Sequence, residues 1–300
     1  MKVGFALPQT VAADGAAPRY RAIRDMALQA EAAGFDSIWV SDHLVMQWDD
    51  KPPEGFWECM TLLAALAEAT DRVELGALVV CTAFRNPALL AKMASALDEV
   101  SDGRFILGVG AGWHKPEFDA FGYPFDHLAS RFEEAMAIVL PLLREGTVDF
   151  AGAYERATNC INAPRGPRPA GPPVLMGTQG PRLIRLAARD ADAWNACWLG
   201  RAQELPEKLR PFRDALSDVG RDAGDIELTV GQVATFSKFA GSVDFPGGTE
   251  RFTFRDPAEL AEEWSRFEEA GVSHLILWFL PETFEMAQLL ADALQIYRRT

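Results

Sequence analysis

The chain is poor in cysteine, poor in positive charge and free of long hydrophobic runs. Its four cysteines are far apart, and none of them forms the close spacing that a metal site uses: Cys59, Cys81, Cys160 and Cys197. Lysine and arginine number 29 against 43 aspartates and glutamates, so the net charge is −14 at pH 7. This acidity argues against nucleic acid or an anionic membrane surface as the main partner. No apolar stretch reaches the roughly 20 residues that a membrane-spanning helix needs.

The start of the chain lacks the features of a secretion signal. Met1 and Lys2 lead directly into the short apolar run VGFALP, which is typical of a strand. Widely separated cysteines in such a chain indicate reduced thiols. We therefore expect a cytoplasmic protein.

Motifs of several large enzyme classes are also missing. The sequence has no H-E-x-x-H, no P-loop, no G-x-S-x-G, no suggestive Cys–His pair and no lysine placed for Schiff-base chemistry. This absence favours chemistry that comes from an organic cofactor over chemistry from a nucleophile or a metal. A barrel that has lost its cofactor and serves as an interaction protein is an alternative.

Short apolar runs alternate with segments of helical periodicity along the whole chain. The expected strands are 3–7, 37–41, 73–81, 104–110, 173–176, 191–199, 226–236 and 272–279. The expected helices are 19–33, 58–69, 87–100, 127–144, 181–190, 205–219, 257–270 and 283–298. Eight such units predict a (β/α)8 barrel made of one domain, residues 1–300, and an open doubly wound sheet is the alternative.

Four segments of this pattern are expected to be loops. Residues 47–55 and 114–125 follow the second and fourth strands, and 145–173 and 237–255 are long insertions. Residues 148–154 within the third segment are compatible with a short strand pair. In a barrel, such loops at the carboxyl ends of the strands carry the active site.

The segment RFILGVGAGW (104–113), which begins with the fourth strand, contains glycines at alternate positions, namely Gly108, Gly110 and Gly112. Glycine weakens a strand, so this repetition needs a reason. One interpretation is a ligand that lies flat against bare backbone. The other is close packing against neighbouring strands. The run does not open a helix, which argues against a dinucleotide-binding turn.

Polar residues follow two of the expected strands. Asp42 and His43 end the second strand, where a histidine can carry a proton or simply be a structural residue. The turn from Gly177 to Arg182 leads into a helix and is typical of a phosphate site. A competing phosphate turn is Gly247-Gly248-Thr249.

Many aromatic residues are expected at strand ends or in the loops beside them. They are Trp48, Phe56, Trp57, Trp113, Phe118, Phe121, Trp198, Phe236 and Trp278. Aromatic side chains can form the wall of a pocket for a flat ligand, although each one alone is equally compatible with core packing.

Four segments together resemble the bacterial luciferase-like superfamily, and within it the branch that depends on the deazaflavin coenzyme F420. They are FDSIWVSDH (35–43), ELGALVVCTAFRNPALLAK (74–92), GRFILGVGAGWHKPEFDAFGYPF (103–125) and LMGTQGPRLIRLAARDADAWN (175–195). The resemblance implies an oxidoreductase with a (β/α)8 barrel that binds its cofactor at the carboxyl ends of the strands. Hydride would pass between a substrate carbon and C5 of the deazaflavin.

The resemblance also implies roles for particular residues. His43 is the expected proton carrier, and Asp42 orients it or contacts the ring. The other expected cofactor contacts are Leu78 and Val79 at a non-prolyl cis peptide that backs the ring, Gly110, Ala111 and Gly112 beside the cofactor side chain, and Gly177, Thr178, Gln179 and Gly180 around its phosphate. Lys115 and Arg182 are candidates for binding its acidic tail.

One departure concerns the substrate. The sugar-phosphate-oxidising F420 enzymes have a glutamate after the strand-4 glycine, where this chain has Trp113. We therefore expect no glucose-6-phosphate dehydrogenase activity and a small apolar or flat organic substrate, with Trp48, Trp113 and Trp198 lining its pocket. The alternative within the superfamily is a two-component monooxygenase that uses reduced FMN and O2. The resemblance further implies a homodimer, with an interface on the helices after strands 2 and 3, and a separate cofactor reductase.

Overall fold

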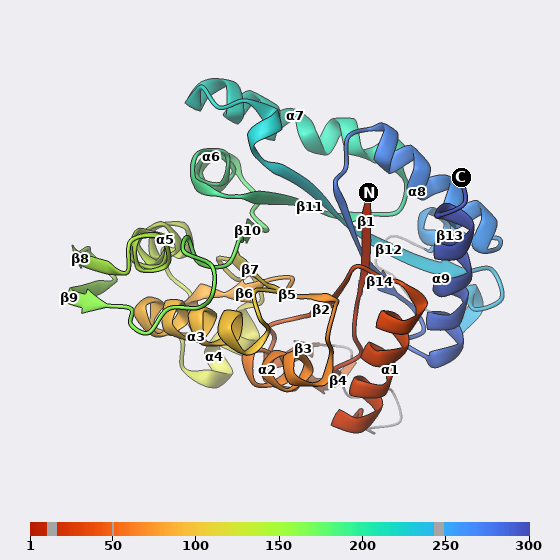
Figure 1. Cartoon of the computed structure of the whole chain (residues 1–300), viewed down its shortest axis with the longest axis horizontal. Helices are drawn as coiled ribbons and strands as arrows, with labels where there is room; N and C mark the ends of the chain where they lie inside the picture. The colour runs from red at the N-terminus through yellow and green to blue at the C-terminus, as the bar shows by residue number, and fades with distance from the viewer. Residues whose placement is uncertain (11–16, 50, 243–248) are drawn as a thin grey trace.

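The computed structural model describes residues 1–10, 17–49, 51–242 and 249–300. Eight parallel strands of the described chain close into a ring in the order β1, β2, β5, β7, β10, β11, β12 and β14, and β14 pairs with β1 again. Figure 1 shows these strands at the centre with the helices outside them. The prediction of a (β/α)8 barrel is confirmed, and the alternative of an open sheet is wrong.

The strands of the barrel agree closely with the expected ones. Their bounds are β1 Lys2–Ala6, β2 Ser37–Val40, β5 Glu74–Ala77, β7 Phe105–Gly110, β10 Val174–Met176, β11 Ala193–Leu199, β12 Glu227–Phe236 and β14 His274–Phe279. The third expected strand is interrupted at Leu78 and Val79 and resumes as β6, Val80–Cys81, which pairs with β7. The Leu78–Val79 peptide bond is cis, as the resemblance implied.

The helices of the barrel lie where the helical periodicity of the sequence predicts them. Their bounds are α1 Tyr20–Ala33, α2 Cys59–Ala69, α3 Pro87–Val100, α5 Leu128–Arg144, α6 Pro181–Asp190, α7 Leu205–Val219, α8 Pro257–Glu269 and α9 Phe284–Tyr297. Side-chain caps fix several of their first turns: Asn86 accepts a hydrogen bond from the Leu89 amide at 3.1 Å, and Asp256 accepts one from Glu259 at 3.0 Å. None of the described helices is long and apolar enough to cross a membrane.

The two shorter segments expected to be loops contain regular structure. Residues 47–55 contribute to a hairpin of β3 Val45–Trp48 and β4 Lys51–Gly55, and residues 115–121 form the short helix α4 Lys115–Phe121. The loop prediction is wrong because prolines are tolerated in a two-stranded ribbon and in the first turn of a helix. Gly122, with φ of 76°, ends α4 in the left-handed conformation.

The two insertions differ from each other. Residues 145–173 contain an antiparallel hairpin of β8 Thr147–Ala151 and β9 Arg156–Ile161, which confirms a strand pair there. It projects beyond α5 in Figure 1. Residues 237–255 contain the short strand β13 Thr253–Phe254, which pairs with β12. Short 3-10 turns complete the described chain: Thr82–Phe84, Ala202–Glu204, Ala223–Asp225, Ala240–Ser242 and Glu250–Phe252.

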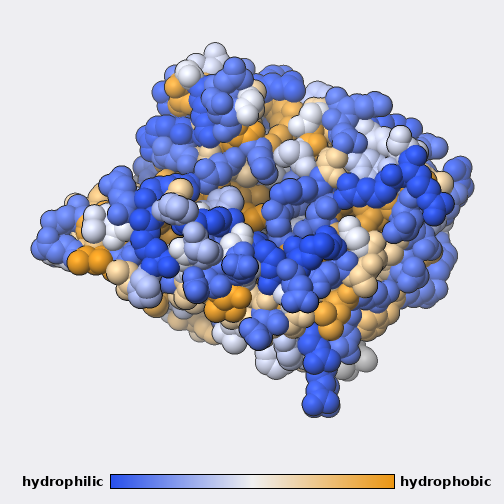
Figure 2. Space-filling model, viewed as in Figure 1, coloured by the Kyte–Doolittle hydropathy of each residue, from blue (hydrophilic) through white to orange (hydrophobic). Residues whose placement is uncertain are grey.

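Apolar residues fill both the inside of the barrel and the layer between strands and helices. The inner cluster consists of Trp39, Ile106, Leu175, Ala193 and Ile276. Trp39 donates a hydrogen bond to Ser37 Oγ at 2.7 Å, so its ring nitrogen is satisfied inside the core. The outer face seen in Figure 2 is mainly hydrophilic, with hydrophobic residues in separate patches.

Candidate active site

The carboxyl end of β2 places His43 beside a buried glutamate. Its Nδ1 lies 2.9 Å from Oε1 of Glu117, whose side chain is 2% exposed. The other oxygen, Oε2, accepts a hydrogen bond from the Leu44 amide at 3.0 Å. Glu117 is thus held from two sides, and it fixes the orientation of the His43 ring.

Aromatic rings surround His43 on its exposed side. The ring of Trp113 lies 5.8 Å from that of His43, and the ring of Phe56, which directly follows β4, lies 5.4 Å from it. Trp48 packs against Trp113 at 6.1 Å, although both indoles remain about half exposed, at 44% and 57%. Half-exposed aromatic rings beside a polar ring form a surface suited to a flat ligand. The structure thus brings Trp48 and Trp113 together with His43.

The β3–β4 hairpin that carries Trp48 is fixed by His114. His114 Nε2 accepts a hydrogen bond from the Gln47 amide at 3.0 Å, and its ring lies 5.0 Å from Trp48. Burial lowers the pKa of His114. Because Nε2 accepts, the neutral ring with its proton on Nδ1 satisfies this contact. His114 therefore stabilises the wall of the site rather than carrying protons.

Asp42 points away from this cluster and binds Arg85. Its Oδ2 lies 2.6 Å from Nη1 of Arg85 and its Oδ1 lies 2.9 Å from Nη2, in a bidentate pair. Oδ2 also accepts a hydrogen bond from the Cys81 amide at 2.9 Å. The Asp42 carboxylate is fully buried. These contacts join the ends of β2 and β6, so the partner that orients His43 is Glu117 and not Asp42.

The alternate glycines of β7 and of the residues directly after it are required by close packing. A Cβ on Gly108 would lie 1.9 Å from the carbonyl oxygen of Ala77, and one on Gly110 would lie 2.6 Å from Val79 Cγ2. A Cβ on Gly112 would lie 2.6 Å from Phe118 Cζ. The packing interpretation of these glycines is therefore confirmed. Ala111, between Gly110 and Gly112, is half-buried and packs against the core.

The turn before α6 is open to solvent. Gln179 and Gly180 are exposed, and a Cβ on Gly180 would meet nothing within 4 Å. Gly177 instead packs under Val79, whose Cγ1 would lie 2.8 Å from an added Cβ. Thr178 is buried, and its hydroxyl donates to the Leu183 carbonyl at 3.3 Å. The open space at the start of α6 therefore lies beside Gly180, and Gly177 and Thr178 lie deeper in the turn.

The two basic residues considered for an acidic cofactor tail are both paired on the surface. Arg182 Nε donates to Glu133 at 2.7 Å, and Lys115 Nζ donates to Asp119 at 2.8 Å. The competing turn at Gly247 and Gly248 lies outside the described residues.

The far wall of the barrel mouth is formed by β11, β12 and β14. Trp198 at the end of β11 packs against Trp278 at 5.8 Å, and both are half-buried. Trp278 Nε1 donates a hydrogen bond to Glu282 Oε1 at 3.0 Å. Trp198 thus contacts Trp278 rather than the Trp48–Trp113 pair, so the three predicted pocket tryptophans stand on two walls.

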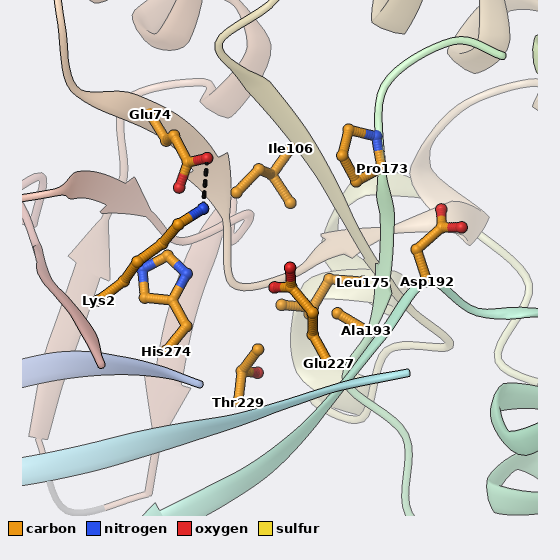
Figure 3. Close-up of a pocket in the computed structure, with 10 residues that line it drawn as sticks. All are labelled: Lys2, Glu74, Ile106, Pro173, Leu175, Asp192, Ala193, Glu227, Thr229 and His274. Carbon is orange, nitrogen blue, oxygen red and sulfur yellow. Dashed lines mark hydrogen bonds and ion pairs between the residues drawn. The ribbon is translucent and has the colours of Figure 1, made fainter. Parts of the chain in front are cut away.

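A separate small cavity, of about 80 Å³, lies at the amino-terminal end of the barrel (Figure 3). Its lining includes Lys2, Glu74, Asp192, Glu227 and His274. Lys2 forms an ion pair with Glu74 at 2.7 Å, as the dashed line in Figure 3 shows. Residues at this end of a barrel generally serve stability. The cavity is therefore distinct from the site around His43.

Comparison with known proteins agrees with this architecture. The profile of the luciferase-like monooxygenase family matches residues 1–238. The chain belongs to this family. An F420-dependent glucose-6-phosphate dehydrogenase of Amycolatopsis mediterranei (strain U-32) is 30% identical over 216 residues, which are 70% of this chain and 63% of that protein. A pyrimidine monooxygenase RutA of Methylobacterium radiotolerans is 34% identical over 56% of this chain and 45% of its own.

The chain thus spans less than two thirds of the length of the curated relatives it matches. A solved structure with the same fold is an F420-dependent secondary alcohol dehydrogenase in complex with an F420-acetone adduct. It superposes with a TM-score of 0.82 and 19% identity, over 99% of both chains. This likeness to other luciferase-like barrels shows the fold.

Four residues at this site were missed by the sequence analysis. Glu117 and His114 lie in the segment expected to be a loop, Arg85 lies in the third-strand segment that carried the resemblance, and Glu282 follows β14. Glu117 is 74 residues from His43 in sequence, and Arg85 is 43 residues from Asp42. No local sequence pattern indicates contacts between residues that are so far apart in the sequence. The signal available for Glu117 was its place in the first turn of α4, after Pro116.

Proposed function

We propose that the protein is an F420-dependent oxidoreductase that moves a hydride to or from a carbon atom of a small organic substrate. The observation that carries this proposal is the His43–Glu117 pair at the carboxyl end of β2. It supports the proposal because hydride transfer at a carbon–oxygen bond also moves a proton, and a held histidine can carry it. The cofactor supplies the hydride chemistry when bound.

The residues present fit a phosphorylated cofactor with a flat ring. At the start of α6, helix geometry leaves the Arg182 and Leu183 amides without intrahelical acceptors, beside the open space at Gly180. Leu78 and Val79 are half-buried and pack on the inner barrel cluster, so they offer an apolar support for a ring. We assign the phosphate to the turn and the ring to the bulge, with Ala111 beside it.

His43 has the role of proton carrier in this proposal. When Nδ1–H is donated to Glu117, Nε2 is left as the atom that accepts a proton from the substrate or returns it. Asp42 is a positioning residue, because its contacts with Arg85 and the Cys81 amide hold the end of β2. Glu117 is a second positioning residue, which acts through the His43 ring.

The proposed substrate is a small apolar or flat organic molecule. The tryptophan rings of Trp48 and Trp113 beside His43 support this choice. These indole rings offer apolar contact area but carry no positive charge that would bind a phosphate group. We therefore propose that sugar phosphates are not substrates, although relatives of the chain are named for glucose 6-phosphate.

We further propose that residues 1–300 act as one domain in a cytoplasmic homodimer, served by a separate cofactor reductase. Free thiols at all four cysteines support a reducing compartment. Leu89 and Val100 on α3 are 53% and 47% exposed, which supports an interface on that helix. Light scattering of the purified protein tests the dimer, and a monomeric mass at micromolar concentration would contradict it.

A direct test of the proposed function compares His43→Asn with His127→Asn. His127 is exposed, and its φ of 51° is tolerated by asparagine, so this variant is a matched control. Alcohols, aldehydes and unsaturated carbonyls are screened with F420 in both redox states, and kcat is measured on the substrate found. We expect His43→Asn to lower kcat by about 10²–10⁴ and the control to leave it unchanged. Turnover with reduced FMN and O2 alone would overturn the proposal.

A further inference from the structure

The β3–β4 hairpin is irregular directly before Trp48. Its register shifts between Met46 and Trp48, so one β3 residue, Gln47, stands opposite two residues of β4. An irregularity of this kind is a β-bulge, which changes the direction of nearby side chains and is common beside active sites. The Gln47 amide donates its hydrogen bond outside the hairpin, to Nε2 of His114 at 3.0 Å. The direction of Trp48 therefore depends on this acceptor.

His114 also contacts both tryptophans that stand beside His43. Its ring centroid lies 5.0 Å from that of Trp48 and 5.1 Å from that of Trp113. The Trp113 ring in turn lies 5.8 Å from the His43 ring. His114 is 4% exposed, whereas the two indoles are 44% and 57% exposed. One buried ring thus supports both exposed rings next to the proposed proton carrier.

The hydrogen bond from Gln47 requires a neutral His114. A neutral imidazole has one nitrogen that accepts a hydrogen bond, and Nε2 has this role in His114. A protonated imidazole carries a hydrogen on both nitrogens, so its Nε2–H would face the Gln47 N–H and the hydrogen bond would be lost. Protonation of His114 therefore breaks the contact that fixes the bulge.

Charged and titratable groups approach His114 from three elements. Burial lowers the pKa of His114, Glu117 of α4 raises it, and His43 at the end of β2 lowers it. The carboxylates of the hairpin that the structure describes are Asp49 and Glu54. Because burial is the largest of these effects, the ring is neutral at pH 7 and takes up a proton only below its ordinary pKa of 6.5.

We propose that His114 is a positioning residue for the substrate, which acts through Trp48 and releases it when His114 takes up a proton. This inference rests on the proposed function, because it concerns the affinity of the same site for its substrate. Substrate affinity is then high at neutral pH and falls in acid, whereas the chemical step at His43 has its own pH dependence. Loss of substrate binding alone raises KM and leaves kcat unchanged.

Two substitutions separate the hydrogen bond of His114 from its titration. His114→Phe keeps an aromatic ring but has no acceptor for the Gln47 amide. His114→Gln carries an amide oxygen that can accept this hydrogen bond, and it does not titrate. With the substrate found in the screen described above, we expect KM of His114→Phe at pH 7.5 to be about three- to tenfold above that of the parent protein, and His114→Gln to recover most of this loss. An equal fall of kcat and of kcat/KM in His114→Phe would contradict a role in substrate positioning.

The pH dependence of KM gives a second readout. Between pH 7.5 and pH 5.0 we expect KM of the parent protein to rise at least about twofold, whereas KM of both variants stays flat. The control is His127→Asn, a change at an exposed histidine, which should keep the rise. A parent KM that stays flat in acid, or an equal rise in His114→Gln, would overturn the proposal. This comparison of the parent with His114→Gln also decides the matter where His114→Phe does not fold.

Hydrogen exchange of the Gln47 amide tests the contact without substrate or F420. The residues next to Gln47 are the same in every variant, so rates measured at pH 7 compare directly. We expect exchange at least about tenfold faster in His114→Phe than in the parent protein, and a slower rate again in His114→Gln. Equal rates in the parent protein and His114→Phe would contradict the inference.

The two proposals fail in different ways. Faster exchange of the Gln47 amide in His114→Phe, without turnover by F420 in any protein, refutes the proposed function alone. Turnover by F420 with the same KM in the parent protein and His114→Phe refutes the role of His114 alone.

Discussion

His43 Nδ1 and Glu117 Oε1 lie 2.9 Å apart, although 74 residues separate them in the sequence. The contact joins the end of β2 to the first turn of α4, and the Leu44 amide holds the second oxygen of the carboxylate. This contact leaves Nε2 of the His43 ring available for proton transfer. It also fixes the direction in which Nε2 points. The proposed function depends on this pair more than on any other contact in the molecule.

Replacing Glu117 by glutamine tests its role in positioning His43. An amide keeps the size of the side chain but replaces one of the two carboxylate oxygens that hold the His43 ring and the Leu44 amide. We expect kcat to fall by at least about tenfold with F420 affinity unchanged, because the His43 ring loses its fixed orientation. The control is Asp119→Asn, an exposed residue of the same helix. An unchanged kcat, or equal losses of kcat and F420 affinity, would show that Glu117 is only structural.

Loss of the Asp42 carboxylate is expected to destabilise the fold. Asp42→Asn leaves the Arg85 guanidinium, which is 9% exposed, without its bidentate partner. Breaking a buried ion pair costs roughly 3–5 kcal/mol, whereas the pair of Arg24 and Asp25 is solvent-exposed and contributes little to stability. Urea unfolding of Asp42→Asn and Asp25→Asn measures the difference. Equal stabilities would mean that the Asp42–Arg85 pair does not hold the strand ends.

Variants of two arginines of α6 can distinguish a direct phosphate contact from a general effect of positive charge on F420 binding. Arg182 and Arg185 are each 57% exposed and each bind a carboxylate, but Arg182 follows the open turn directly. We expect Arg182→Ala to weaken F420 binding by roughly 3–10-fold and Arg185→Ala to leave it unchanged, consistent with an exposed phosphate contact. Equal effects in a binding titration would place the phosphate elsewhere.

Acid sensitivity of the fold is expected to come partly from His274. Burial lowers the pKa of His274 to about 3, and its Nε2 lies 2.7 Å from Ser37 Oγ. The unfolded chain, with a histidine pKa of roughly 6.5, takes up the proton first, so this residue lowers stability as the pH falls below 6.5. Between pH 6.5 and pH 5 the loss is about 2 kcal/mol. Urea unfolding at both pH values should show a smaller loss in His274→Asn, and identical losses would contradict this account.

Much of the fold was predictable because each barrel strand and helix has a local pattern. The apolar runs and helical periodicity located the strands and helices of the barrel, whereas the interruption of the third strand at Leu78 and Val79 was implied only by the family resemblance. The prolines and glycine of residues 114–125 misled the prediction, because the same residues mark loops and helix boundaries. α4 was missed for this reason.

The candidate site was predictable only in part, because its contacts are long-range. The sequence indicated His43 from its place after a strand, but not its partner Glu117, which comes from another strand–helix unit. Asp42 was expected at the cofactor or at His43, and Arg85 holds it instead. The glycines of β7 allowed two interpretations, and only the position of Ala77 and Val79 across the sheet decides between them.

The measurement that tests the central claim most directly is a fluorescence titration of the purified protein with F420 and, separately, with FMN, each in both redox states. The account predicts tight, saturable binding of F420 and weaker binding of FMN. It further predicts that inorganic phosphate competes with F420, because both use the turn before α6. Tight binding of reduced FMN without binding of F420 would contradict the account and make the protein a two-component monooxygenase.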